Sequence, residues 1–184
     1  MKTPDPRTLF TKTMLKTACR DLIEKKQLAK ITVNELCEKA GVNRSTFYRY
    51  YTDIYDLWAE IEEDCFTDLI SRINLPDARD PKVFFSDLFD AIKVNQILTP
   101  TALQHADSSL LIPKIMEHYK KVAFLIWQTN QLDLSKRQLE YRFSILLGAL
   151  TATVQEWIRS GMKDSSDAIA EMMKELGFWG LFEG

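Results

Sequence analysis

The sequence predicts an all-α protein of about nine helices. Apolar residues recur at the helical spacing i, i+3, i+4 and i+7 in nearly every segment, and no segment alternates apolar and polar residues as a strand would. Six glycines and six prolines among 184 residues are too few for the many turns of an all-β protein. Capping residues then place the start and end of each helix.

Two helices are predicted near the N-terminus. The first lies within residues 8–26 and has one apolar face, made of Leu15, Ala18, Cys19 and Leu22. The second starts at a capping box, because Thr32 is followed three residues later by Glu35. It ends at Ala40–Gly41, since glycine is the usual left-handed residue after a helix.

A short helix and a long helix follow. Asn43 caps the short one, which runs from Arg44 to about Tyr51. Asp53 caps the long one, which extends to about Ile73. Its inward face comprises Leu57, Ile61, Cys65, Leu69 and Ile73.

Five further helices complete the prediction. Asp80–Pro81 has the N-cap and N1 order of a helix start, and Thr99–Pro100 starts a short helix. An apolar stripe within residues 112–126 then predicts a long helix. Ser135 and Gln138 open a helix that ends near residue 161, and the last helix covers residues 165–176. These segments complete the nine predicted helices.

Composition points to a cytoplasmic protein without a membrane segment. The chain is 46% hydrophobic and 27% charged, ordinary values for a globular core. The three cysteines, Cys19, Cys37 and Cys65, have no paired spacing and are expected to be reduced thiols. No apolar run is long enough for a signal peptide or for a membrane-spanning helix.

Charge is distributed unevenly along the chain. Residues 1–50 hold 11 Lys and Arg against 5 Asp and Glu, whereas the remaining residues hold 13 against 21. A basic first quarter on an acidic body suggests that the N-terminal end faces a polyanion. Chance asymmetry on solvated helices is the alternative.

The helices on either side of Gly41 form a candidate helix-turn-helix. Gly41 supplies the positive φ of a tight turn. The expected core of the motif is Leu36, Cys37, Ala40, Gly41, Val42, Phe47 and Tyr51. The remaining residues of the motif's second helix are too polar for a core and too aromatic for an ordinary solvent-exposed face. They are Arg44, Ser45, Thr46, Tyr48, Arg49 and Tyr50. In a DNA-reading helix-turn-helix such side chains enter the major groove or bind phosphates.

The stretch "ITVNELCEKAGVNRSTFYRYYTDIYDL" resembles the DNA-binding signature of the TetR family of bacterial repressors. The resemblance covers roughly residues 8–60. It implies a DNA-binding domain followed by a helical ligand-binding and dimerisation domain. We place the boundary after Asp53, where the charge balance changes sign, which gives domains of residues 1–53 and 54–184. The resemblance also implies DNA contacts from six residues, namely Thr32, Arg44, Ser45, Thr46, Tyr48 and Tyr50. We add Arg49 to this set. Arg49 has an alternative, an ion pair with a nearby carboxylate of Glu35, Glu38 or Asp53.

Three residues depart from the family pattern. Cys37 stands where alanine is usual, and Tyr50 stands where histidine is frequent. Ile54 replaces a lysine that contacts phosphate in the family, so that contact is expected to be missing. Lys12, Lys30 or Lys39 would then have to supply the charge.

The stretch "FSILLGALTATVQEWIRSGMKDSSDAIAEMMKEL" resembles the last two helices of the family, with the segment E-W-x-x-x-G-M as its marker. This implies a homodimer that binds a pseudo-palindromic operator. The expected interface residues are Gly148, Ala152, Ile169, Met172, Met173 and Leu176. In the alternative, these stripes pack inside one subunit.

Aromatic residues between positions 54 and 130 could line a pocket for a small apolar or aromatic effector. The candidates are Trp58, Phe85, Phe89, Tyr119 and Trp127. His105 and His118 could add polar contacts. The alternative is that each is an ordinary surface histidine or one whose hydrogen bonds are already satisfied. Their spacing does not suggest a metal site, and we expect no cofactor.

A dimeric regulator released from DNA by a small ligand is the function that these patterns favour. An enzyme is disfavoured, because the sequence lacks common catalytic and nucleotide-binding motifs such as HExxH, GxSxG and GxGxxG. An activator or co-regulator without an effector stays open, since the C-terminal region loosely resembles a Gram-positive subgroup of the family in which such roles occur.

Overall fold

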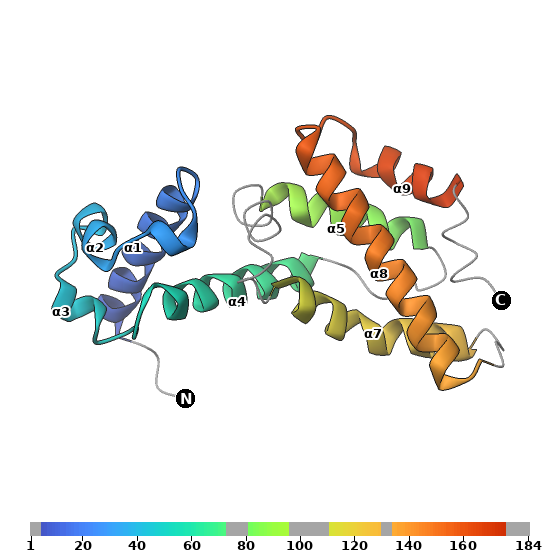
Figure 1. The fold of residues 1–184 in the computed structure, drawn as a ribbon, viewed down its shortest axis with the longest axis horizontal. Coiled ribbons are helices and arrows are strands. Elements are labelled where there is room, and N and C mark those ends of the chain that lie inside the picture. Colours follow the sequence, from blue (N-terminus) through green and yellow to red (C-terminus); the bar gives the residue numbers. More distant parts are fainter. Residues whose placement is uncertain (1–4, 73–80, 96–110, 130–133, 176–184) are drawn as a thin grey trace. The chain divides into compact units, whose positions relative to one another are not determined.

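A computed structural model describes residues 5–72, 81–95, 111–129 and 134–175 of the chain (Figure 1). Every regular element among these residues is a helix, so the predicted all-α class is confirmed. The short helix predicted at Thr99–Pro100 lies outside the described residues, as do Ile73, His105 and Leu176. The described residues divide into two compact units, one within 5–65 and one formed by the rest.

The first unit contains three helices of a bundle, a short 3-10 helix and the start of a fourth helix. In chain order they are α1 (Pro6–Ile23), η1 (Leu28–Lys30), α2 (Val33–Ala40), α3 (Arg44–Phe47) and α4 (Ile54–Arg72). Asp5 caps α1 by accepting a hydrogen bond from the Arg7 amide at 2.9 Å. The fully buried residues of this unit, Leu15, Cys19, Leu36, Phe47, Leu57 and Ile61, come from α1, α2, α3 and α4. The first turns of α4 therefore belong to the same core as the helix-turn-helix.

The turn between α2 and α3 is built by the backbone of Gly41. Its φ of 64° and ψ of 30° lie in the left-handed region, which glycine enters without penalty. The Gly41 amide donates to the Glu38 carbonyl at 3.2 Å, and the Val42 amide donates to the Cys37 carbonyl at 3.0 Å. This pair of bonds is the Schellman motif, which ends α2 at the predicted residue.

The third helix is shorter than the sequence predicts. Regular α3 ends at Phe47, whereas the prediction extended it to about Tyr51. The amides of Arg49 and Tyr50 donate to carbonyls three residues back, at 3.3 and 2.9 Å, which tightens the last turn. The ring of Tyr51 is nevertheless buried, with its centroid 5.6 Å from that of Phe47.

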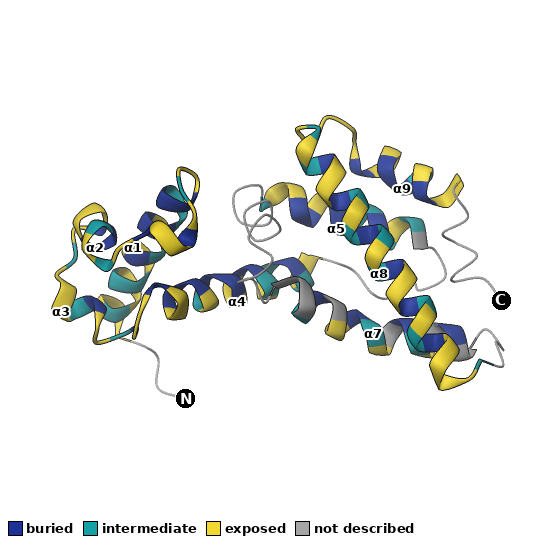
Figure 2. Ribbon diagram, in the orientation of Figure 1, coloured by how far each residue is buried: buried dark blue, intermediate teal, exposed yellow. Residues whose placement is uncertain are grey.

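The second unit is formed by the end of α4 and four further helices. These are α5 (Pro81–Val94), α7 (Leu111–Thr129), α8 (Lys136–Arg159) and α9 (Ser166–Glu175). Ser135 and Gln138 form the complete capping box predicted at the start of α8. Buried and exposed residues alternate along α8 at helical spacing, as Figure 2 shows. One face of α8 thus contributes to the core and the other remains at the surface.

Polar contacts hold α9 against α5. Ser86 Oγ donates to Asp167 Oδ1 at 2.7 Å, and Lys82 Nζ pairs with Glu171 Oε2 at 2.8 Å. The two helices are also in direct contact, so α9 packs on α5 within the second unit.

Candidate nucleic-acid interface

The polar residues of the helix-turn-helix lie on its surface. Arg44, Ser45 and Arg49 are exposed, and Tyr48 is 52% exposed. The Tyr48 ring stands edge-on to buried Phe47, with centroids 5.3 Å apart, so packing fixes its direction. Arg44 and Ser45 of α3, with Tyr48 and Arg49 just after it, therefore present two cations, a hydroxyl and a phenol on one short surface segment.

Two hydroxyl groups of the motif have local roles that orient them. Thr32 Oγ1 accepts from the Glu35 amide at 3.3 Å and so caps α2. The Glu35 side chain does not complete the predicted capping box but pairs with Lys26. Ser45 Oγ donates to Asn43 Oδ1 at 3.0 Å, which commits its proton and leaves its lone pairs available as acceptors.

Arg49 has no ion pair within the described part of the chain. Of the three carboxylates considered as partners, Glu35 pairs with Lys26, and Asp53 accepts a hydrogen bond from the Asp56 amide at 2.9 Å. The guanidinium of Arg49 is thus free to meet a phosphate.

Ile54 is a core residue at the first position of α4, only 5% exposed. Of the three lysines considered as substitutes for the missing charge, two are engaged. Lys12 Nζ pairs with Glu60 at 2.7 Å, and Lys39 Nζ pairs with Asp21 at 2.8 Å. Lys30 is exposed and, among the described residues, forms no ion pair, which makes it the available cation of the three.

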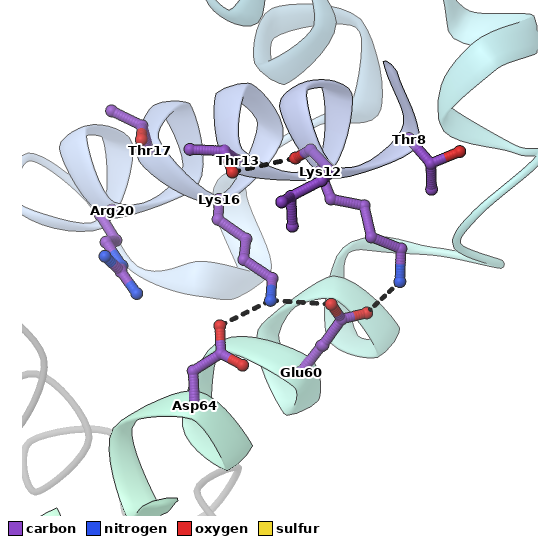
Figure 3. Close-up of a pocket in the computed structure, with 9 residues that line it drawn as sticks. Thr8, Lys12, Thr13, Lys16, Thr17, Arg20, Glu60 and Asp64 are labelled. Carbon is purple, nitrogen blue, oxygen red and sulfur yellow. Dashed lines mark hydrogen bonds and ion pairs between the residues drawn. The ribbon is translucent and has the colours of Figure 1, made fainter. Parts of the chain in front are cut away.

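A cluster of four charged residues joins α1 to the start of α4 (Figure 3). Lys16 Nζ lies 2.7 Å from Glu60 Oε1 and 2.6 Å from Asp64 Oδ2, while Lys12 binds the other oxygen of Glu60. Burial alone would raise the pKa of Glu60, but the hydrogen bonds from both lysines outweigh it and lower that pKa. We call Lys12, Lys16, Glu60 and Asp64 the α1–α4 clamp.

The clamp borders a groove of about 510 Å³ between the two helices. Besides the clamp, its lining residues are Thr8, Leu9, Thr13, Thr17 and Arg20. Glu60 and Asp64 offset most of the cationic charge that lines the groove, and their ion pairs with Lys12 and Lys16 join α1 to α4.

Thr8 is a residue that the sequence analysis did not single out. Its Oγ1 lies 3.4 Å from the Tyr50 hydroxyl, although the residues are 42 positions apart. A sequence signal existed, because Thr8 lies seven residues before Leu15 and continues the buried face of α1 toward its N-terminus. Both Thr8 and Tyr50 are partly exposed, so the pair is open to solvent.

The five aromatic residues proposed for an effector pocket belong to different units. Trp58 lies in the first unit, where its Nε1 donates to buried Glu62 at 2.9 Å. The other four residues, Phe85, Phe89, Tyr119 and Trp127, are buried in the second unit. We call these four the buried aromatic set of the second unit, and a pocket lined by all five residues stays a prediction.

Tyr119 has an unusual environment within that set. The residue is 7% exposed, and its buried hydroxyl has no hydrogen-bond partner among the residues that the structure describes. Its ring stands edge-on to Phe84 at 5.1 Å, and burial raises the pKa of its phenol. His118, by contrast, is exposed and stacks edge-on with Phe66 at 6.0 Å.

The residues proposed for a dimer interface also divide. Ile169 and Met173 are buried inside the second unit, as expected for the alternative in which these residues pack inside one subunit. Met172 is 41% exposed, and Gly148 and Ala152 are exposed on α8. With Tyr141 and Ile145, the last two form an exposed small and apolar stripe along α8.

Other chemistries find little support in the described ranges. They hold no group of three or more His, Cys, Asp or Glu side chains placed to bind a metal ion. No helix there is long and apolar enough to cross a membrane. The three cysteines are buried.

Comparison with protein families covers both units. Residues 15–61 match a family described as bacterial regulatory proteins of the tetR family. Residues 79–177 match a family described as the C-terminal region of a transcriptional regulator. No curated protein sequence matches the chain.

Solved structures share the fold over most of their length. The fatty acid degradation regulator FadR from Bacillus halodurans has a TM-score of 0.71 at 15% identity, with all of both chains covered. The dihydroxyacetone kinase operon activator DhaS has a TM-score of 0.61 at 20% identity, covering 95% of this chain and 98% of its own. A regulator of the same tetR family from Streptomyces coelicolor has a TM-score of 0.65 at 15% identity, covering 93% and 79%.

Proposed function

Since the chain belongs to the TetR family of bacterial transcriptional regulators, we propose that it binds a specific operator as a homodimer and acts as a repressor released by a small ligand. The observation that carries the proposal is the exposed polar surface of the helix-turn-helix. Residues 1–53 would supply the DNA contacts, and residues 54–184 the regulation and dimerisation.

Two groups of DNA contacts are assigned within this surface. Arg44, Ser45 and Thr46 begin α3, and we assign them to base edges in the major groove. The remaining contacts go to backbone phosphates and position the helix, from Thr32, Tyr48, Arg49 and Tyr50. Lys30, which is exposed and lies two residues before Thr32, adds a positive charge just before the helix-turn-helix begins.

The exposed stripe on α8 is the proposed dimer contact. A two-fold interface brings the same surface of each subunit together, and small residues such as Gly148 and Ala152 allow two helices to approach closely. We call α3, which would enter the major groove, the recognition helix. A dimer of this kind would place its two recognition helices ~34–36 Å apart, one turn of DNA.

The buried aromatic set of the second unit is the proposed effector site. Its polar element would be the Tyr119 hydroxyl, because a buried group without a partner gains a hydrogen bond when a ligand supplies one. In one arrangement of the dimer the recognition helices would be unable to reach both half-sites of the operator. A ligand that binds this arrangement more tightly would increase its population and so release the protein from DNA. An apolar or aromatic molecule with one hydrogen-bonding group fits this chemistry.

A gel shift tests DNA binding directly. An inverted repeat from the promoter beside the gene would be titrated with purified protein at low salt, where phosphate attraction is strongest. Tyr48→Ala should weaken binding to every sequence, whereas Thr46→Ala should change base preference by about 1–3 kcal/mol at one position. Thr17→Ala, an exposed threonine of α1, serves as the control. Wild-type protein that binds no DNA at low salt would overturn the proposal.

An activator or co-regulator is the second candidate. The fold is similar to that of DhaS, which is named as an operon activator. Reporter expression in a deletion strain separates the two roles. Loss of a repressor raises expression of the target operon, and loss of an activator lowers it.

A further inference from the structure

The hydroxyls of Thr8 and Tyr50 converge from distant parts of the chain. They lie 3.4 Å apart, well beyond the ~2.7–2.8 Å typical of a good O–H···O hydrogen bond. Their mutual bond is therefore weak, and it uses only one of the two hydroxyl protons. At least one proton, and both if the weak bond opens, can be donated to an outside acceptor.

Thr8 differs from the neighbouring threonines of α1 in how its hydroxyl is used. Thr11 and Thr13 each donate to the carbonyl four residues earlier, at 2.9 Å. The corresponding carbonyl for Thr8 precedes the first residue of the helix, since α1 begins at Pro6. Its hydroxyl is thereby left to face Tyr50.

The surroundings of the pair suit an anion with several oxygens. Two hydroxyls at this spacing can each approach an oxygen of one phosphate group at the ~2.5–2.7 Å typical of O–H···O⁻ bonds. Exposed Arg7 precedes Thr8 and forms no ion pair within the described ranges. The α1–α4 clamp, one turn further along α1, holds the helix start in place.

We propose that Thr8 and Tyr50 together bind one backbone phosphate of the operator, so that the start of α1 is anchored to the same strand as the recognition helix. This inference rests on the proposed DNA-binding function and adds Thr8 to its contacts. Thr8 and Tyr50 act as one two-hydroxyl site, and neither hydroxyl suffices alone.

The test is a double-mutant cycle on operator affinity, measured by fluorescence anisotropy with the full chain. Thr8→Val and Tyr50→Phe remove the hydroxyls with little change in shape. Each should weaken binding roughly three- to tenfold per half-site. The fold-loss of operator affinity in the double variant should be clearly smaller than the product of the fold-losses in the two single variants. Thr8→Ser should restore binding, and Thr13→Val, on the same helix, should leave it unchanged.

Salt dependence distinguishes this site from a charge contact. The hydroxyl variants should lower affinity at every salt concentration without changing the slope of log K against log salt, because no counterion is involved. Arg49→Gln should instead reduce that slope by about one.

A second measurement excludes a purely structural effect of these variants. Operators with single methylphosphonate substitutions should reveal one phosphate per half-site whose neutralisation weakens the wild type but not Thr8→Val. If wild-type protein binds the operator and Thr8→Val binds equally well, the two-hydroxyl site is wrong while the proposed function stands. If wild-type protein binds no DNA, both fail.

Discussion

Replacement of Gly41 by alanine tests whether the turn of the helix-turn-helix depends on backbone conformation alone. Gly41 has a φ of +64°, and a Cβ built on it would meet no atom within 4 Å. No steric clash therefore contributes to the effect. What remains is the cost of holding an L-residue in the left-handed region.

That cost sets the expected magnitude. A left-handed conformation costs a residue with a side chain roughly 1–2 kcal/mol. We therefore expect Gly41→Ala to destabilise the first unit by about 1–2 kcal/mol. Gly41→Asn should cost less, since asparagine tolerates this conformation better. Gly161→Ala, at a φ of +82° with equally open surroundings, should have a similar effect in the second unit.

Amide hydrogen exchange is the suitable assay, because it reports each unit separately. The amides of Leu36 and Phe47 donate to carbonyls of the first unit at 3.0 Å and report its opening. Their protection should fall in Gly41→Ala and stay unchanged in Gly161→Ala. Equal protection in Gly41→Ala and the wild type would refute the conformational argument.

Three further predictions concern other parts of the chain. Tyr119→Phe should raise the Tm, because it removes a buried hydroxyl that has no partner among the described residues. Burying such a hydroxyl costs about 1–3 kcal/mol. A lower Tm would contradict this prediction. Glu60→Gln should lower the Tm near neutral pH. The folded-state pKa of Glu60 lies below its ordinary 4.5, so its contribution is complete above that value and is lost as the pH falls through the folded pKa. The Tm difference should shrink in acid, and a constant difference would point to packing instead. Ile145→Glu, at a residue 59% exposed on α8, should convert dimer to monomer in light scattering, whereas Leu125→Glu, 62% exposed on α7, should not. A dimer that persists in Ile145→Glu would place the interface elsewhere.

Local chemistry made several elements predictable from the sequence. Thr32 and Ser135 start helices, and Gly41 ends one, because each effect involves backbone groups only a few residues away. The helical period likewise revealed which faces are apolar. The end of α3 escaped prediction, since the choice between α and 3-10 hydrogen bonds after Phe47 is settled by packing as well as by local preference.

Only the tertiary structure decided which residues meet. The periodicity of α9 places Ile169, Met172 and Met173 near one another, but packing in the second unit buries the first and last and leaves Met172 exposed. Trp58 and Tyr119 looked alike in the sequence, yet they belong to different compact units. The Thr8–Tyr50 pair spans 42 positions, and no local rule connects them. By itself, the sequence determined where most of the described helices start and which of their faces are apolar, because those depend on neighbours within a few residues. The tertiary structure alone decided which of these faces became core and which surface, because burial depends on helices that are distant in the chain.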